Sequence, residues 1–285
     1  MSSEAPAAGP PEPDHARRFG VIWLVSTLIA LPLVIFVLGP NLPPGHGSDV
    51  ASGQVTDNTV LTAMATPVLL LVVIYLIYAI VNFRQPKGGM LEGPAVRGNA
   101  GLQTTWIIVT GALVLSLAVY GTVRLEQGYG AGSGSGPKPL TVPSGKKLPV
   151  QVIAQQWAFT YRYPTYGGVE TTHLELPVNE DIELHVTSLD VIHSFWAYQL
   201  GVKADANPGV DNVTFVKPTK IQTFEVHCAE LCGLWHGAMY DHGKVVSDAD
   251  FETWIHEEQR TFAATTKVLP PYATTYAPEP VRRGS

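Results

Sequence analysis

The stretch HCAELCGLWHGAM, residues 227–239, contains both cysteines of the 285-residue chain. Cys228 and Cys232 lie four positions apart, and His236 and Met239 follow directly. In an oxidising compartment two cysteines form a disulfide by default. A bridge across so short a separation would close a very small loop, which gives little stabilisation and risks strain. Metal binding is therefore a strong alternative use of these thiols.

The residue types around the cysteines favour copper over zinc. Thiolate, imidazole and thioether are the ligands of copper electron-transfer sites, which β-sandwich folds carry. Zinc prefers four strong nitrogen or sulfur ligands and has no use for Met239. A mononuclear copper site needs only one cysteine, so two thiolates suit a pair of copper ions. A second histidine must then come from elsewhere; the candidates, each by default an ordinary solvated or hydrogen-bonded residue, are His173, His185, His193, His227 and His242.

The composition places part of the chain in a membrane, because 46% of the residues are hydrophobic and only 15% are charged. Three runs without a charged residue, at 21–38, 60–81 and 105–123, are each near the roughly 20 residues that span a bilayer. The first run, after the basic pair Arg17-Arg18, could instead be a cleaved signal peptide. Its length and the lack of a small-residue cleavage site favour an uncleaved helix.

Basic residues predict the orientation of these helices. Arg17 and Arg18 precede the first run, and Arg84, Lys87 and Arg97 lie between the second and third. No lysine or arginine occurs between residues 40 and 59. By the positive-inside rule, the tail 1–20 and the 83–104 loop are cytoplasmic, and everything after residue 123 is outside.

The rest of the chain predicts an all-β outer domain. A Gly/Ser-rich linker occupies 124–140. From about residue 148, short runs rich in Val, Ile, Phe, Tyr and Thr alternate with Pro, Gly, Asn and Asp, which is typical of a small sandwich or barrel. We assign this domain to 141–260. The segment 261–285 is rich in Pro, Ala and Thr and is expected to be a flexible tail.

Two further motifs make the sequence similar to a known family. DVIHSFWAYQLGVKADANPG at 190–209 lies 35 positions upstream of the cysteines, counted from His193 to Cys228, and QQWAFTYRY occupies 155–163. Together with HCAELCGLWHGAM they resemble subunit II of haem-copper cytochrome c oxidases over roughly residues 55–260. The resemblance implies a membrane-anchored all-β protein, in which the helices, here with an extra first one, precede a cupredoxin-like β-sandwich or barrel.

The resemblance also implies a dinuclear copper A centre. Cys228 and Cys232 would each bridge both coppers. His193 and Met239 would complete one ion, and His236 with the backbone carbonyl of Glu230 would complete the other. The Glu230 carboxylate would also help bind magnesium at the interface with subunit I, as a hard oxygen ligand suits that ion.

The implied function is electron entry into a cytochrome c oxidase. The chain would accept electrons from cytochrome c at Trp157 and pass them through the copper pair to haem in subunit I, where oxygen is reduced to water. Without the resemblance, an aromatic residue in a strand is more often core. Subunit I, subunit III and the lipid bilayer are the expected partners, with no nucleic acid. The expected location is a bacterial plasma membrane, with the copper domain on its outer face.

Three details qualify this picture. Gln103 stands where the family often has a glutamate near a proton path, and glutamine cannot ionise.

Both thiols are committed to copper, so this chain is expected to carry no haem. Residues 141–260 contain sixteen acidic and eight basic residues, which would steer a basic cytochrome c, with Asp190 the first candidate for that role.

Two alternatives stay open from the sequence. The same copper site could serve a nitric oxide reductase or another membrane-anchored copper electron carrier. A copper-storage or delivery domain is the third class, and it predicts Cu(I) without electron sharing between two ions.

Overall fold

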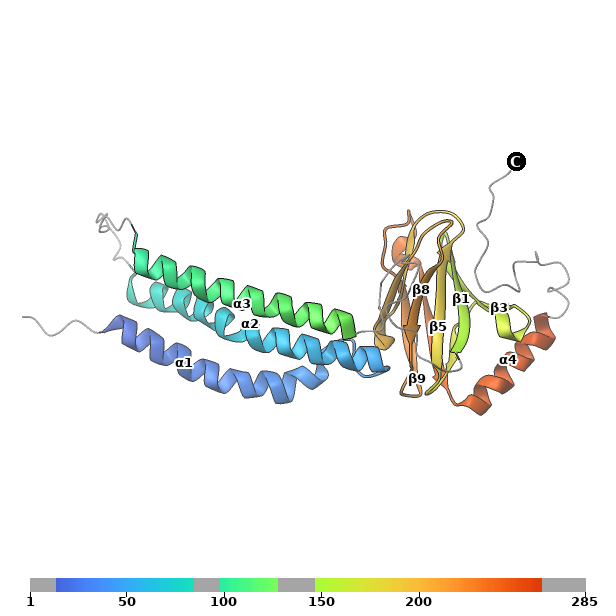
Figure 1. Ribbon diagram of the computed structural model, residues 1–285, viewed down its shortest axis with the longest axis horizontal. Helices are drawn as coiled ribbons and strands as arrows, with labels where there is room; N and C mark the ends of the chain where they lie inside the picture. Colours follow the sequence, from blue (N-terminus) through green and yellow to red (C-terminus); the bar gives the residue numbers. More distant parts are fainter. Residues whose placement is uncertain (1–13, 85–97, 128–146, 263–285) are drawn as a thin grey trace, which may run out of the picture. The chain divides into compact units, whose positions relative to one another are not determined.

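The computed structural model describes residues 14–84, 98–127 and 147–262 (Figure 1). The predicted linker beyond residue 127 and the tail beyond residue 262 lie outside the described residues. The chain divides into two compact units, residues 1–42 with 56–96 and residues 43–55 with 97–285.

The first unit pairs two antiparallel helices. Helix α1 (His15–Leu33) continues through a π turn, η1 (Val34–Leu38), and a 3-10 turn, η2 (Gly39–Asn41); most of α2 (Asp49–Asn82) packs beside it. The indole nitrogen of Trp23 donates to the carbonyl of Pro67 at 2.9 Å, and His15 Nδ1 lies 2.8 Å from the Tyr78 hydroxyl. These contacts join the start of α1 to the second half of α2.

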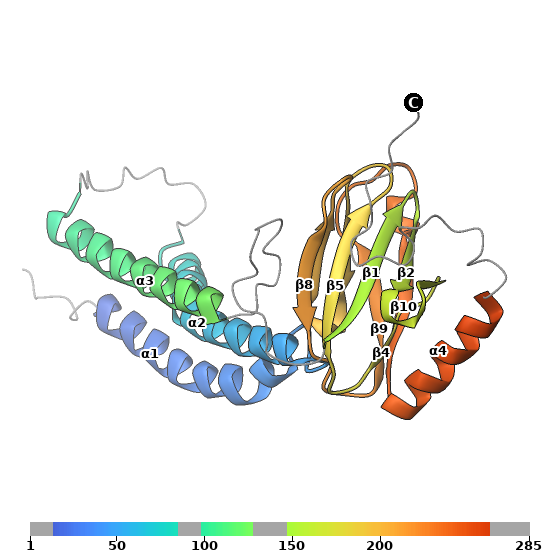
Figure 2. The same ribbon diagram turned by 45° about the vertical axis from the view of Figure 1, so that its right-hand side comes forward.

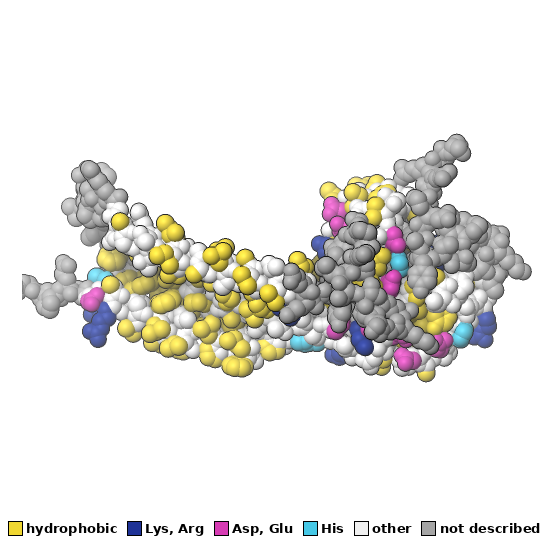
Figure 3. Space-filling model, viewed as in Figure 1, with side chains coloured by type: hydrophobic (Ala, Val, Ile, Leu, Met, Phe, Trp, Pro, Cys, Tyr) yellow, Lys and Arg dark blue, Asp and Glu magenta, His cyan; other side chains and the backbone are white. Residues whose placement is uncertain are grey.

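Three helical segments have the length and composition of membrane spans. They comprise residues 15–41, 49–82 and, in α3 (Ala100–Gln127), residues 100–125, and the most apolar 18 residues in each have mean hydropathies of 2.8, 2.6 and 2.0. Their apolar side chains point outward, as Figure 3 shows for the helices, which suits lipid rather than water. The structure thus confirms three membrane-type helices. Each is longer than its apolar run, because the flanking polar residues continue the helix.

The outer domain consists of two five-stranded sheets, with strand orders β3-β2-β1-β5-β8 and β4-β10-β9-β6-β7. The strands are β1 (Lys147–Gln155), β2 (Ala158–Tyr163), β3 (Val169–Thr171), β4 (Glu175–Pro177), β5 (Asp181–Ser188), β6 (His193–Ala197), β7 (Val202–Ala206), β8 (Asn212–Val216), β9 (Gln222–Cys228) and β10 (Tyr240–Val246). Alternate residues such as Val150, Val152, Leu184, Phe195 and Phe224 are buried and form the core. This is the predicted cupredoxin-like sandwich.

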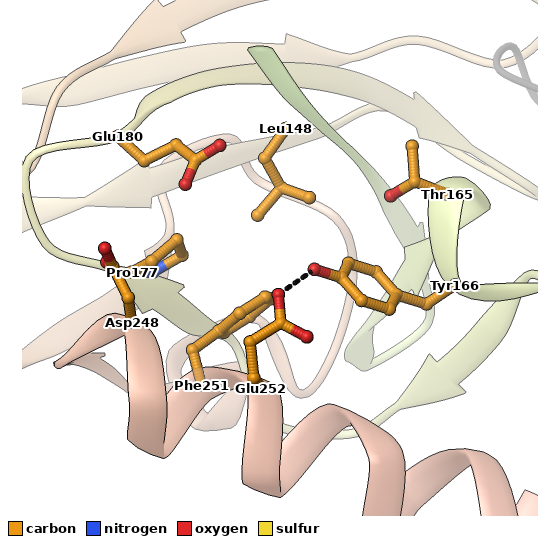
Figure 4. A pocket seen from close by; sticks show the side chains of 8 residues that line it. All are labelled: Leu148, Thr165, Tyr166, Pro177, Glu180, Asp248, Phe251 and Glu252. Atoms are coloured by element: carbon orange, nitrogen blue, oxygen red, sulfur yellow. Dashed lines mark hydrogen bonds between the residues drawn. The ribbon is translucent and has the colours of Figure 1, made fainter. Parts of the chain in front are cut away.

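Helix α4 (Asp248–Phe262) was not predicted, and it carries two residues that the sequence analysis assigned to the tail. It lies next to β3 and β4 (Figure 2) and buries Phe251 and Ile255 in the core. The Tyr166 hydroxyl donates to the Glu252 carboxylate at 2.7 Å, beside a pocket of about 450 Å³ (Figure 4). The domain is therefore a β-sandwich closed on one side by a helix, since the apolar stripe of α4 needs cover.

Within the second unit, the first turn of α2 is hydrogen-bonded to the β domain. The Ser48 hydroxyl donates to the Leu200 carbonyl and the Gln54 amide to the Gly201 carbonyl, both at 2.7 Å. Ala51, between them, is completely buried. The end of η4 (Tyr198–Leu200) thus holds the segment that leads into a membrane span.

Candidate metal centre

The loop between β9 and β10 carries the motif, and backbone hydrogen bonds hold it at both ends. The Cys228 amide donates to the Met239 carbonyl at 3.0 Å, and the Ala229 amide donates to the Ser194 carbonyl at 2.9 Å. Strand β6 pairs with β9 so that Phe195 lies opposite Cys228. His193, two residues before Phe195, is thereby brought to the loop from 35 positions away in the sequence.

Four side chains meet where the strand and the loop converge. Cys228 Sγ lies 3.7 Å from Cys232 Sγ and 3.8 Å from His193 Nδ1. His193 Nδ1 lies 3.2 Å from Met239 Sδ, and Cys232 Sγ lies 3.8 Å from the same sulfur. The ligand atoms of His193 and the two cysteines all lie within 4.8 Å of one another. Two sulfurs 3.7 Å apart are free thiols, since a disulfide would hold them about 2.05 Å apart.

These separations fit shared coordination of a soft metal. Metal bonds to thiolate sulfur and imidazole nitrogen are about 2.0–2.3 Å long in tetrahedral zinc sites, so two ligands of one such ion lie roughly 3.3–3.8 Å apart. The contacts among the thiols, His193 Nδ1 and Met239 Sδ cover nearly this range, from 3.2 to 3.8 Å. The distances therefore fit a metal site, and the thiolate, imidazole and thioether donors are the set that copper electron-transfer sites use.

The two remaining residues that the resemblance implies as ligands, His236 and Glu230, also lie next to the thiols. His236 Nδ1 is 3.6 Å from Cys232 Sγ, and the Glu230 carbonyl oxygen is 3.2 Å from Cys228 Sγ. His236 is held by the 3-10 turn η5 (His236–Ala238). His236 and the Glu230 carbonyl therefore each lie beside one of the two thiols.

The site is dry. His193 is fully buried, and the exposed fractions of Met239, Cys232 and Cys228 are 2%, 3% and 8%. Burial, followed by the hydrogen bond and charge of Cys228, raises the pKa of the Cys232 thiol to about 12 in the metal-free chain. A metal ion would have to displace this proton, since the thiolate is the ligand.

Asp190 orients His193, which the sequence analysis did not foresee. Its Oδ1 lies 2.9 Å from His193 Nε2, and its other oxygen accepts from the Gln156 amide at 2.7 Å. Burial alone would raise the pKa of Asp190, but the hydrogen bonds from the Gln156 amide, His193 and the Val191 amide bring it below its usual value. Asp190 therefore contacts the site directly, and the expectation that it also helps to guide a protein partner stays a prediction.

Trp157 lies against the metal-binding loop. It follows Gln156 in the turn between β1 and β2, and the Gln156 side-chain amide donates to the Cys232 carbonyl at 2.8 Å. A Cβ on Gly233 would lie 3.4 Å from the Trp157 indole nitrogen, so ring and loop are in close contact. Trp157 is half-buried, with one side packed on the core and the rest reaching the surface.

The other candidate residues lie outside the cluster. His173, His185 and His227 pair with Asp241, Asp211 and Glu225, respectively, and His242 is exposed. The Glu230 side chain is exposed beside the loop, and Gln103 is exposed in the first turn of α3. Of the five candidates for the second histidine, His193 alone lies beside the thiols.

Comparison with known proteins identifies the family. Residues 170–246 match the family model of the cytochrome c oxidase subunit II periplasmic domain. Cytochrome c oxidase subunit 2 of Thermostichus vulcanus is 29% identical over 87% of this chain and 88% of its own length. The corresponding protein of Synechocystis sp. is 25% identical over 88% of this chain and 87% of its own length.

A solved structure completes the comparison. The crystal structure of the periplasmic domain of subunit II of cytochrome oxidase of Bradyrhizobium japonicum is 33% identical. The match covers 43% of this chain and 99% of the crystallised domain, with a TM-score of 0.41. The family model, the relatives matched over nearly their whole length and the assembled ligand cluster lead to one conclusion: the chain belongs to the cytochrome c oxidase subunit II family.

Proposed function

We propose that this chain is the electron-entry subunit of a respiratory cytochrome c oxidase, accepting electrons from cytochrome c and delivering them to haem in subunit I. The observation that carries the proposal is the buried cluster of two free thiols, His193 Nδ1 and Met239 Sδ. The same ligands could serve other copper electron carriers, but the matched relatives are named as oxidase subunits.

Two copper ions are the metal we assign to the cluster. The two ions would be held by Cys228, Cys232, His193, Met239, His236 and the Glu230 carbonyl. Bound in this way, the pair would supply a one-electron couple with the unpaired electron shared across both ions.

The protein's own task is to keep this arrangement fixed and dry. Asp190 directs His193 Nδ1 toward the thiols, and the Cys228–Met239 backbone hydrogen bond closes the loop. Burial of the ligands excludes water. A first shell that is held in place needs little rearrangement when the charge changes, which favours fast electron transfer.

Trp157 is the proposed entry point for electrons. Its ring lies against Gly233 of the ligand loop, and the residue is half-buried. The excess of acidic residues in 141–260 would attract a cationic cytochrome c and speed its association at low ionic strength.

The loop itself offers a surface for subunit I. Leu231, Leu234 and Trp235 are 78%, 85% and 57% exposed, and large apolar side chains grouped in this way are typical of a protein interface. Glu230 lies among them and would supply a carboxylate oxygen to magnesium at that interface. We assign the chain to a bacterial plasma membrane with this domain on the outer face, and subunit III as a further partner.

Trp157→Phe in the assembled oxidase tests the entry role. Stopped-flow reduction by cytochrome c should slow by an order of magnitude or more, with the affinity for cytochrome c nearly unchanged, because phenylalanine keeps the packing but loses the indole. Trp254→Phe, the same change in a half-buried residue of α4, is the control and should react at the wild-type rate. Equal rates of reduction in the two variants would show that Trp157 is a packing residue and not the entry point for electrons.

A further inference from the structure

A pocket in the first unit lies between the start of α1 and the end of α2. Its volume is about 520 Å³, and its lining residues are Asp14, Arg17, Arg18, Val21, Ile22, Tyr78 and Asn82. Both helices belong to one compact unit, joined nearby by the contact between His15 Nδ1 and the Tyr78 hydroxyl. The metal centre lies in the other unit, so the pocket has no part in it.

The polar end of the pocket carries a net positive charge. Arg17 and Arg18 are exposed, and neither guanidinium forms an ion pair or hydrogen bond with another residue in the described parts of the chain. The one carboxylate, Asp14, caps α1 by accepting from the Arg17 amide at 3.0 Å. Asn82 uses its side-chain amide on the Tyr78 carbonyl. Two unpaired guanidinium groups therefore face a single acid, which favours an anion.

The other end of the pocket is apolar and continues into the membrane span. Val21 and Ile22 are 54% and 44% exposed, one turn beyond the arginines along α1. The span of α1 begins at this level, so the pocket lies where headgroups give way to hydrocarbon. The positive-inside rule assigns this end of the helices to the cytoplasmic leaflet, which carries anionic lipid.

We propose that this pocket binds the headgroup of an anionic phospholipid from the cytoplasmic leaflet. Arg17 and Arg18 pair with the phosphodiester, since the planar guanidinium matches two phosphate oxygens at once. Val21 and Ile22 pack against the first methylene groups of an acyl chain. A free phosphate ion would use the arginines but not the apolar wall, so lipid is the ligand that fits the whole pocket.

The test uses the full-length chain in phosphatidylcholine nanodiscs with a rising share of phosphatidylglycerol. Native mass spectrometry counts the lipids that stay bound. The wild-type chain should retain phosphatidylglycerol in preference to phosphatidylcholine. Arg17→Gln combined with Arg18→Gln should weaken this binding about thirty-fold, because each basic residue near an anionic surface contributes a factor of about five. Arg84→Gln removes a charge at the same end of α2 but outside the pocket, and should weaken binding by no more than the factor of about five that a basic residue at this surface contributes.

Three results would overturn the proposal. They are equal retention of the two lipids, an equal loss in the Arg84→Gln control, and displacement of phosphatidylglycerol by inorganic phosphate as effective as by phosphatidylglycerol itself. Because Arg17 and Arg18 also favour the membrane orientation, a variant with both changed to lysine keeps the charge. It should retain the preference for anionic lipid but bind several-fold more weakly, since lysine lacks the fork geometry.

Discussion

Asp190 Oδ1 lies 2.9 Å from His193 Nε2, and this contact determines which imidazole nitrogen faces the thiols. With Nε2 held by the carboxylate, Nδ1 points at Met239 Sδ and Cys228 Sγ, 3.2 and 3.8 Å away. A carboxylate behind a metal-binding histidine fixes the ring orientation and makes the nitrogen a better ligand. The same carboxylate also holds the turn that carries Trp157, through the Gln156 amide.

Asp190→Asn should therefore lower copper affinity by about 10- to 100-fold, the usual effect of removing such a partner. Competition with a chelator of known Cu(I) affinity measures it. Glu225→Gln is the matched control, because Glu225 contacts the half-exposed His227 at 3.1 Å, outside the ligand cluster. Should both variants bind copper as the wild type does, the orienting role of Asp190 would be wrong.

Gly233→Ala should destabilise the ligand loop by about 1–3 kcal/mol, the range for a residue held in an unfavourable backbone region. Gly233 has a φ of +121°, and its added Cβ would lie 2.9 Å from the Gln156 side-chain amide nitrogen. Gly237→Ala is the control, because a Cβ there meets nothing within 4 Å. Thermal unfolding of the two metal-free variants should separate them, and equal melting temperatures would contradict the close contact.

Met239→Leu should change the reduction potential of the copper centre, whereas Cys228→Ser should remove the electron sharing between the two ions. Leucine fills nearly the same buried volume, so the first variant should keep a dinuclear centre with a changed reduction potential, since a weak axial ligand tunes more than it holds. Serine removes one of two bridging thiolates and with it the electron sharing. Copper analysis with a redox titration makes the comparison; equal loss of both coppers in the two variants would refute this ranking.

The apparent copper affinity should rise with pH. With its pKa raised to about 12, the Cys232 thiol is protonated in the metal-free chain at neutral pH, whereas the ligand is the thiolate. Binding therefore releases this proton, and affinity gains up to about tenfold per pH unit for each proton released. Chelator competition at several pH values tests the sign, and an affinity independent of pH would mean that the thiolate forms before the metal arrives.

Much of the fold follows from sequence pattern. The three apolar runs predict membrane-type helices because few other structures need about 20 uncharged residues in succession. The alternating Val, Ile and aromatic residues predict β1, β5 and β9. Strands β3 and β4 are three residues each, too short for a periodic pattern. Helix α4 carries its apolar stripe on Phe251, Trp254 and Ile255 within a charged segment, so a reading of strand propensity passes over it.

The sequence likewise predicts some features of the metal site and not others. The ligand types and their spacing in 227–239 predict the cluster, because a loop this short has few ways to arrange them. The partnership of Asp190 with His193 depends on how the turn between β5 and β6 folds the carboxylate back. Spacing alone shows only that Asp190 lies beside the ligand segment, and an exposed acid would have the same spacing. The Gln156–Cys232 contact joins residues 76 positions apart and has no local signal.

The most direct test of the central claim is the copper content of the full-length chain, together with its electron paramagnetic resonance spectrum. We expect two copper ions per chain at saturation. The oxidised spectrum should show one unpaired electron coupled equally to both nuclei, because both thiolates would be shared by the two ions. Saturation at a single copper with mononuclear hyperfine structure would contradict the account.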